Sequence, residues 1–576
     1  MNLEKLNRVV AKTSFGKYFK LENSGASNTR DTQFTTELRA GLTTFFAMAY
    51  IVAVNASIVA DSGGPCVCQQ PDVANTCIGD PDYAACQMVV KRDIITATAA
   101  VSCLATAIMG VFANLPLGLA PGMGLNAYFA YTVVGFHGGG KVQYQTAIAA
   151  IFLEGIIFAI LSIFGIRQWL AKLIPKSIKN AAGAGIGLFL CFIGLQKNAG
   201  IALITTDPAT VVSLGGCPDQ YFNGTTGACT SHHMESPITW FGILGFLIIA
   251  ILLLYKVKGS LLLGITFISV VSWFRNSQVT YFPYTPDGDE RFDFFKNVVG
   301  FHPIEKTLGA MNFDFSNKDI WIALITFLYV DIFDATGTIY SMAKFGGFTD
   351  ETGNFEGATA AYICDASSIS IGAIFGLPPV TAYVESGAGI MEGGRTGITS
   401  LTISFFFFIS LFFAPIFASL PPWATGPALV VVGSLMVRSI KNINWDYVGD
   451  AVPSFLTIAI MPLTFNIAYG LIAGIGTYII INNFVWILEK ASRGYISYDK
   501  SLKELWDGPG DEGLLPLWLV DITSKARKIK KPATTMETET IEISKEQMNN
   551  EANYEVNNEV NNEVNNEVNN EMKMEV

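Results

Sequence analysis

Four carboxylic acids lie within long apolar stretches of the sequence: Glu154, Asp331, Asp334 and Glu385. A carboxylate at the centre of a membrane-spanning helix costs about 2.5–3.5 kcal/mol on insertion scales. An acid kept at that cost can bind a proton, accept N–H groups from a polar solute, or form an ion pair inside the protein. These acids are therefore the first candidates for chemistry.

Glu385 lies in PPVTAYVESG, where prolines and a glycine interrupt an apolar run. Its carboxyl group can take up and release a proton, or accept two N–H bonds from a heterocycle; the alternative is a polar residue at a helix end. Asp331 and Asp334, in FLYVDIFDATGT, share one helix face at positions i and i+3. Two buried carboxylates that close do not both ionise readily. We expect Asp331 to be the site group and Asp334 its support, with an ion pair to Arg39 or a lysine as the alternative.

A second interruption, APGMGLNAYF, contains Gly124 and Asn126. The amide of Asn126 can donate and accept hydrogen bonds at once, which suits a ring with both kinds of group; helix capping is the alternative. Phe129 follows, and its face could stack on a base, although core packing is the alternative. Glu154 is far from both interruptions, which favours structural bonding between helices.

The elements that hold these residues are membrane helices. The chain is 51% hydrophobic and 15% charged, with a mean hydropathy of +0.39, whereas soluble domains carry about 25% charged residues. A helix needs about 20 apolar residues to span a bilayer. We predict an all-α polytopic membrane protein of about fourteen segments. Candidate spans lie near 38–60, 93–113, 144–165, 179–196, 237–255, 260–274, 319–340, 398–419, 425–437, 450–466 and 467–488, with shorter, interrupted segments near 117–134, 361–376 and 378–390.

The two halves of the chain correspond. In residues 113–131 and again in 375–390, an apolar helix is followed by Leu-Pro and then by an interrupted stretch. Residues 174–195 also resemble residues 420–437. Proline ends a helix because it lacks an N–H and clashes with the preceding turn, and the freed backbone groups cannot face lipid. Matching interruptions in two halves are a pointer to a transporter's binding site. The alternative is a pair of ordinary loop–helix junctions.

Lys and Arg in short loops place the N-terminal tail in the cytoplasm; Lys91 and Arg92 disagree with this orientation. Loops 61–92, 197–236 and 276–318 then face outward. Cysteines there suggest disulfides in an oxidising compartment, with free or metal-bound thiols as the alternative, and Asn223 begins a glycosylation sequon. The six cysteines are Cys66, Cys68, Cys77, Cys86, Cys217 and Cys229.

Several classes of function lack support. Much of the acid behind the net charge of −11 lies in a tail that repeats Asn-Asn-Glu-Val, and no basic patch with interleaved aromatics suggests nucleic-acid binding. No Walker A, H-E-x-x-H or G-x-S-x-G motif indicates an enzyme or an ATP-driven pump. We expect no cofactor and no metal. An anion exchanger would need basic or N–H groups at the interruptions, where this chain has carboxylates.

The motifs APGMGLNAYFAYTVVGF, LYVDIFDATGT, PVTAYVESGAGI and EGGRTG, with TTELRAGLTTFFAMAYIVAVN before them, resemble the AzgA-like family of hypoxanthine–adenine–guanine permeases. The likeness runs from about residue 10 to 490. It implies a seven-plus-seven inverted repeat with two broken segments (a short strand plus a half-helix each), and a core domain that moves against a gate domain. It also implies a homodimeric, proton-coupled symporter of adenine, guanine and hypoxanthine; some plant relatives carry cytokinins.

On this resemblance, purine would bind at Asn126, Asp331 and Glu385, with Gly124 beside them, and Asp334 close by as a further acid for proton coupling. We expect a multi-pass protein of the plasma membrane. Its predicted parts are a cytoplasmic tail (1–35), core domain (36–166 and 319–419), gate domain (167–275 and 420–489), extracellular loop (276–318) and disordered acidic cytoplasmic tail (490–576).

Overall fold

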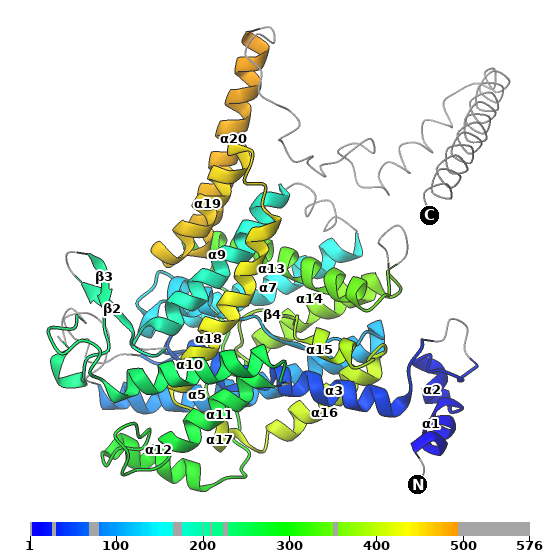
Figure 1. Cartoon of the computed structure of the whole chain (residues 1–576), viewed down its shortest axis with the longest axis horizontal. Helices are drawn as coiled ribbons and strands as arrows, with labels where there is room; N and C mark the ends of the chain where they lie inside the picture. Colours follow the sequence, from blue (N-terminus) through cyan, green and yellow to red (C-terminus); the bar gives the residue numbers. More distant parts are fainter. Residues whose placement is uncertain are drawn as a thin grey trace, which may run out of the picture. The chain divides into compact units, whose positions relative to one another are not determined.

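The computed structural model describes residues 3–25, 30–67, 80–164, 175–197, 200–207, 210–222, 228–257, 259–349 and 355–492 (Figure 1). Cys68, Cys77 and Asn223 lie outside the described residues, as does the tail from residue 493. The described part is predominantly helical, which confirms the predicted fold class.

Eight of the described helical stretches are long and apolar enough to cross a membrane, and four shorter apolar helices accompany them. The count of fourteen segments stays a prediction. The helices are α1 (Leu3–Ala11), α2 (Ser14–Tyr18), α3 (Phe34–Met48), α4 (Ile51–Ala60), α5 (Pro81–Ile108), α6 (Met123–Tyr128), α7 (Tyr144–Ile163), α9 (Lys176–Leu195), α10 (Pro237–Leu254), α11 (Ser260–Ser272), α12 (Pro286–Lys296), α13 (Lys318–Phe345), α14 (Ala358–Ile374), α15 (Ser386–Met391), α16 (Gly397–Ser410), α17 (Ala414–Ala418), α18 (Pro422–Met436), α19 (Val448–Leu463) and α20 (Ile467–Ala491).

The two interrupted segments each begin with a short strand and continue as a half-helix. Strand β1 (Leu119–Pro121) leads into α6, and β4 (Val380–Ala382) is followed by α15. The strands pair antiparallel, with Ala120 opposite Thr381. The backbone groups that proline frees from the helices are therefore paired with each other. A second hairpin, β2 (Ile204–Asp207) with β3 (Val211–Leu214), lies in a loop.

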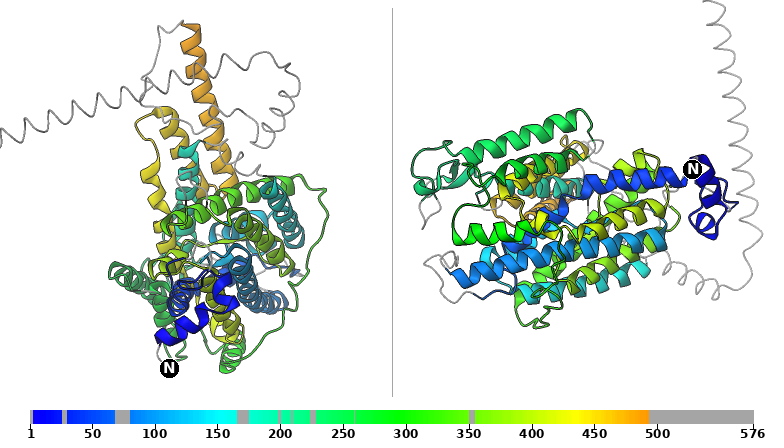
Figure 2. Two further views of the ribbon diagram at one scale, coloured as in Figure 1. Left: turned by 90° about the vertical axis from the view of Figure 1, so that its right-hand side faces the viewer. Right: turned by 90° about the horizontal axis from the view of Figure 1, so that it is seen from below.

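The helices pack in two groups. In the first, α16 lies beside α3 and α5, and α7 packs on α13 and α14; the views in Figures 1 and 2 show α3, α5 and α16 side by side. In the second, α9 packs on α18 and α19, and α10 packs on α11 and α18. Helices α9 and α18, the pair that the internal repeat relates, cross at glycines: a Cβ added at Gly187 would lie 2.6 Å from the carbonyl oxygen of Gly433. Small residues permit such close crossings in membranes.

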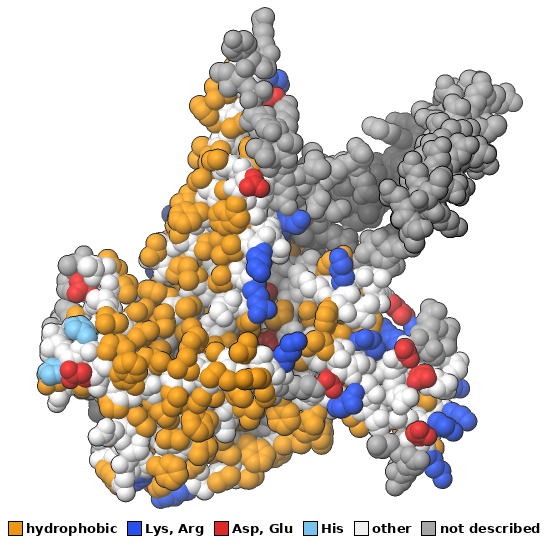
Figure 3. All heavy atoms as spheres, in the orientation of Figure 1, with side chains coloured by type: hydrophobic (Ala, Val, Ile, Leu, Met, Phe, Trp, Pro, Cys, Tyr) orange, Lys and Arg blue, Asp and Glu red, His pale blue; other side chains and the backbone are white. Residues whose placement is uncertain are grey.

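Apolar side chains cover the outside of the second group. Figure 3 shows hydrophobic side chains over α10 and α11, where Leu254 is 77% exposed and Phe267 is 47% exposed. On α20, Ile480 is 70% exposed. An exposed apolar surface of this extent suits contact with lipid rather than water.

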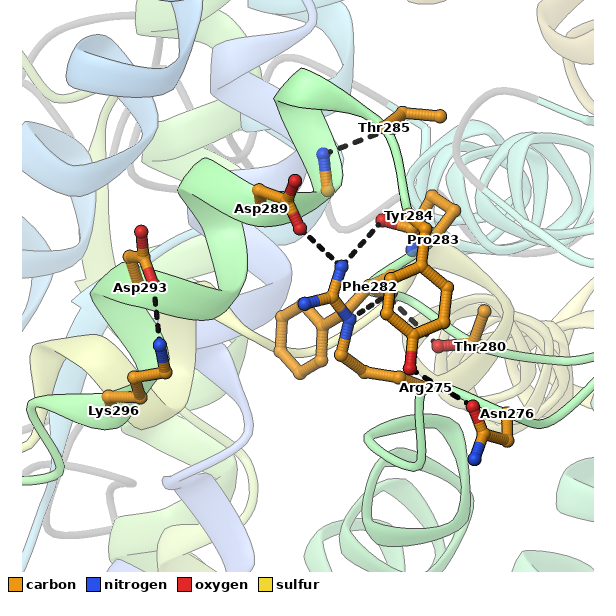
Figure 4. A network of polar contacts seen from close by, with 11 residues as sticks. Arg275, Asn276, Thr280, Phe282, Pro283, Tyr284, Thr285, Asp289, Asp293 and Lys296 are labelled. Atoms are coloured by element: carbon orange, nitrogen blue, oxygen red, sulfur yellow. Dashed lines mark hydrogen bonds and ion pairs between the residues drawn. The ribbon is translucent and has the colours of Figure 1, made fainter.

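The loop after α11 and the following helix α12 are joined by a network of polar contacts around Arg275 (Figure 4). The guanidinium of Arg275 donates to Asp289 of α12 and to the carbonyl oxygens of Phe282 and Pro283, and it lies 4.1 Å from the ring centroid of Tyr284. The same loop receives Lys91 and Arg92, the pair that disagreed with the charge rule.

Lys91 donates to the hydroxyl of Tyr281 (3.2 Å), and Arg92 pairs with Glu290 (3.3 Å). These two cations lie in the first half of α5, beside the loop predicted to face outward, and the orientation stays a prediction. Nearby, Cys66 is bonded to Cys86, and Cys217 is bonded to Cys229 in another of the predicted outer loops. The cysteines of the spans, Cys103, Cys191 and Cys364, are free.

Candidate functional site

The site is built around the crossing of the two broken segments. Beyond the strand register, the N–H of Gly122 donates to the carbonyl oxygen of Pro379 (2.9 Å), and the N–H of Tyr383 donates to that of Gly118 (3.0 Å). The crossing is fully buried along both strands. It holds α6 and α15 at fixed positions within the apolar part of the protein, where irregular backbone is tolerated only if it is paired or lines a cavity.

A cavity of about 400 Å³ lies beside this crossing. It is bounded by the first broken segment, by α13, by Val384 of the second broken segment, and by α9 with one residue of α18, so it lies between the two packing groups. Its lining residues are Gly122, Gly124, Leu125, Lys179, Asn180, Ala182, Gly183, Ile186, Tyr329, Val330, Phe333, Asp334, Thr336, Gly337, Thr338, Ser341, Val384 and Met436.

The cavity combines aromatic faces with polar groups. Tyr329 and Phe333 lie one helical turn apart on α13, with ring centroids 4.7 Å from each other. The ammonium of Lys179 lies 5.6 Å from the centroid of Phe333. Asp334, on the same helix, supplies a carboxyl group. An apolar pocket with a few polar groups of this kind is typical of a site for a small organic molecule, and flat rings suit a heterocycle.

Glu385 lies directly after Val384, which lines the cavity and is 59% exposed. Its carboxyl group is half-buried and accepts a hydrogen bond from the hydroxyl of Tyr50 on the segment between α3 and α4 (2.9 Å). The carboxyl groups of Glu385 and Asp334 are near enough to interact electrostatically. One acid, Asp334, therefore lines the cavity, and a second, Glu385, lies beside it on the neighbouring segment.

Asp331 points elsewhere. It is fully buried and interacts electrostatically with Glu154 of α7 and Asp365 of α14, and it is not among the residues that line the cavity. Of the two acids of α13, Asp334, predicted to be the support, lines the cavity, and Asp331, predicted to be the site group, does not. Three residues along a helix are about 60° apart around its axis, which is enough to turn one acid inward and the next toward the opening.

The residues of the first broken segment divide in the same way. Gly124 lines the cavity. Asn126 is buried behind it, where its Nδ2 donates to Oδ1 of Asn55 (2.7 Å), whose own amide donates to Thr98 (2.7 Å). Phe129 is also buried, with its ring against the edge of Tyr144 at a centroid distance of 5.5 Å. Asn126 and Phe129 thus lie in the core rather than on the cavity.

The sequence reasoning missed Tyr329, Phe333, Lys179 and Asn180. The spacing of Tyr329 and Phe333, four residues apart, places both on one helix face beside Asp334, so they could have been found once the orientation of α13 was known. Lys179 lies in the first turn of α9, in no motif of the sequence. Its position at the cavity follows from the packing of α9 beside α6, which no local pattern reveals.

Comparison with known proteins identifies a matching family and several similar sequences. The profile of the Permease family (Xan_ur_permease) matches residues 82–472. An efflux pump, notK', of Aspergillus versicolor is 53% identical over 89% of this chain and 90% of its own length. A candidate xanthine/uracil permease of Schizosaccharomyces pombe is 51% identical over 90% of this chain and 83% of its own length. The guanine/hypoxanthine permease PbuO of Bacillus subtilis is 34% identical over 81% of this chain and 93% of its own length.

Among solved structures, the murine solute carrier 26 family member A9, an anion transporter in the inward-facing state, matches with a TM-score of 0.50. The match covers 78% of this chain and 68% of that chain at 11% identity. At this identity the likeness concerns the fold alone.

Proposed function

Because the chain belongs to the purine nucleobase permease family, a family of membrane-spanning transporters and not of enzymes, we propose that it carries adenine, guanine and hypoxanthine together with protons. The observation that carries this proposal is the cavity at the crossing, which is lined by Asp334 and two aromatic rings and has Glu385 beside it. A purine offers N–H donors along its edge and two flat faces. Carboxylates accept from the edge, and Phe333 or Tyr329 packs on a face.

In this proposal Glu385 and Asp334 bind the base, and Asp331 takes part in proton coupling. Asn126 fixes the position of the first broken segment through Asn55 rather than by contact with the base. Gly124 lets that segment approach α9 closely. The assignment follows the placement of the side chains around the cavity.

Transport would follow an elevator-type alternating-access scheme. The group that holds the crossing (36–166 and 319–419) moves as a core against a gate (167–275 and 420–489), and the purine travels with the core. The cavity between the two groups supports this scheme. Its lining includes Lys179 and Asn180 near the start of α9, where Lys176 is also basic. A basic end of a membrane helix favours the cytoplasmic side, which supports an inward-open conformation. We further propose a homodimer in the plasma membrane.

Two observations favour variants of this function. The relative that is 53% identical is named an efflux pump, which favours a test of export as well as import. The cavity of about 400 Å³ falls in the size range of pockets for drug-sized ligands, which favours a test of N6-substituted adenines such as cytokinins. An anion exchanger on the same fold is disfavoured by the acids at the cavity.

Uptake of radiolabelled bases in cells that lack their own purine transporters tests the proposal. Adenine, guanine and hypoxanthine should enter faster than in vector controls and compete with one another, and uracil should compete poorly. A protonophore should abolish accumulation. Cells preloaded with label give the rate of export. Uptake equal to that of vector controls, with surface expression confirmed by biotinylation, would overturn the proposal.

A further inference from the structure

Three acids meet inside the core, away from the cavity surface: Glu154 of α7, Asp331 of α13 and Asp365 of α14. All three are fully buried, and the carboxyl groups interact electrostatically with one another. The helices come close at this level because the residue after Glu154 is glycine: a Cβ at Gly155 would lie 2.4 Å from Oγ of Ser370 and 2.9 Å from the carbonyl oxygen of Ala366. We refer to Glu154, Asp331 and Asp365 as the acid cluster.

The members from α7 and α13 have no donors from other residues. Among the described residues, the carboxyl groups of Glu154 and Asp331 hydrogen-bond only with each other, which requires a proton on one of them, and neither takes part in an ion pair there. A buried carboxylate without donors or a counter-charge is far more costly than a neutral carboxylic acid. Like charges in one buried site add to that cost.

Two other buried acids, Glu37 and Asp93, accept several hydrogen bonds. Glu37 accepts from the backbone N–H groups of Arg395 (2.8 Å), Thr396 and Thr399 and from the hydroxyl of Thr399 (2.6 Å). Asp93 accepts from three backbone N–H groups and from His302. Both are as deeply buried as Glu154. Full donor sets stabilise a fixed negative charge, whereas the acid cluster is arranged for carboxyl groups that carry protons.

The acid cluster is also connected to the crossing. Oδ1 of Asp365 accepts from the N–H of Ala382 in β4 (3.1 Å), three residues before Glu385. Asp331 interacts electrostatically with Asp334 on the cavity. A change of charge in the cluster therefore acts on both acids proposed to bind the base. It acts on Glu385 through the hydrogen bond to β4 and on Asp334 through the electrostatic interaction with Asp331.

Resting on the proposed function, we propose that the coupling proton is carried by the acid cluster of Glu154, Asp331 and Asp365, and not by the acids that contact the base. A proton that enters from the outer side converts a carboxylate of the cluster to a neutral carboxylic acid. The loaded core then moves without an uncompensated charge among its helices. On the inner side the same O–H bond breaks, the proton leaves to water, and the cluster regains its negative charge.

Protons fit this cluster better than a metal cation. No group of three or more His, Cys, Asp or Glu residues in the described part of the chain is arranged to hold a metal ion. The titratable groups that act on Asp331 are Glu154, Asp365 and Asp334, and those that act on Glu154 are Asp331 and Asp365. All of them are acids. Imposed sodium gradients are nevertheless included as an arm of the test.

The test uses full-length protein in liposomes, with two readouts. Exchange of labelled for unlabelled hypoxanthine across the membrane needs binding and core movement but no net proton flux. Accumulation driven by a gradient of one pH unit needs coupling, and it reaches about tenfold for each coupled proton. Wild type should show both. Glu154→Gln should retain exchange within about threefold and lose accumulation, because its neutral amide resembles the protonated acid in shape.

The matched control is Ser162→Ala, which removes a buried and unpartnered oxygen of α7 and should keep exchange and accumulation. If Glu154→Gln is misfolded by size-exclusion chromatography, Asp365→Asn makes the same test from α14. Infrared spectra of the wild type, which need no variant, should show the carbonyl band of a protonated carboxylic acid that changes when the inner pH is raised.

The outcomes separate this inference from the proposed function. Accumulation of about tenfold by folded Glu154→Gln, loss of its exchange, accumulation driven by sodium instead of protons, or absence of a protonated carboxyl band would each overturn the acid cluster. Absence of purine exchange by the wild type would instead overturn the proposed function.

Discussion

The two broken segments share a backbone plan and differ in what their side chains do. The first, β1–α6, turns Asn126 into the core, where Asn55 and Thr98 continue its hydrogen bonds, and presents Gly124 to α9. The second, β4–α15, carries Glu385 directly after the cavity-lining Val384, with Tyr50 as its donor. A repeated interruption therefore does not mean a repeated function. The first segment presents a glycine, Gly124, to the cavity, and the second carries an acid, Glu385, beside it.

In the proposed mode of binding, this division sets the orientation of a purine. If both segments carried acids, a base could bind either way round between them. With the acid on the second segment and on the neighbouring α13, the N–H edge of the base is expected to face Glu385 and Asp334. Gly122, Gly124 and Leu125 of the first segment line the cavity, and in this proposal they are expected to face the opposite side of the ring.

Removal of the acid from the second segment should have the largest effect. Glu385→Ala should lower kcat/KM for hypoxanthine uptake by about ten- to a hundredfold, since hydrogen bonds to charged groups contribute about 1.5–3 kcal/mol. Initial rates of uptake at equal surface expression measure this. Glu392→Ala, an acid of the same segment that pairs with Arg39 (3.1 Å), is the control and should have little effect. Equal losses in the two variants would remove the special position of Glu385.

A methyl group on the first segment should block movement rather than binding chemistry. A Cβ at Gly124 would lie 2.4 Å from Cγ2 of Ile186, so Gly124→Ala should reduce the transport rate severalfold, with overpacking costs of about 1–3 kcal/mol. The double variant Gly124→Ala/Ile186→Ala should recover much of the rate.

Gly337→Ala is the matched control, because it also lines the cavity but has no atom within 4 Å of the added Cβ. It should transport normally. Failure of Ile186→Ala to rescue Gly124→Ala would mean that the glycine acts by some means other than this contact.

The two acids of α13 should separate base binding from coupling. Asp334→Asn should raise KM about tenfold, equivalent to about 1.4 kcal/mol, and keep the dependence on the pH gradient. Asp331→Asn should leave KM within about threefold and lose accumulation. The KM values and accumulation ratios of both variants in one preparation measure the contrast. A larger rise of KM in Asp331→Asn than in Asp334→Asn would reverse the assignment.

The smallest expected effect concerns the amide pair behind the first segment. Asn126→Ala leaves Oδ1 of Asn55 without its donor, and Asn55→Ala breaks the same bond from the other side. Each should lower the free energy of unfolding by about 1–3 kcal/mol and leave the order of preference among purines unchanged. Thermal unfolding in detergent gives the stability, and the double variant should be less destabilised than the sum. A changed purine preference in Asn126→Ala alone would place that amide at the base.

Local sequence patterns predicted the helical class and the two broken segments, but not the directions of the side chains on them. Prolines and glycines located both broken segments, and the cost of acids in apolar runs located Glu385 and the acids of α13. The rotation of α13, which decides whether Asp331 or Asp334 meets the cavity, depends on its packing against α7 and α14. The partner of Asn126 is 71 residues away, and the far wall of the cavity comes from α9. Tertiary packing decides each of these points, and a single sequence does not contain it in readable form.

The most direct measurement is a cryo-electron microscopy map of the protein with bound hypoxanthine. The account predicts density for a flat ring in the cavity beside the crossing, with its edge at the carboxyl groups of Glu385 and Asp334 and one face against Phe333 or Tyr329. Density for the base at Asp331 and Asn126, with the cavity of α13 and α9 empty, would contradict it.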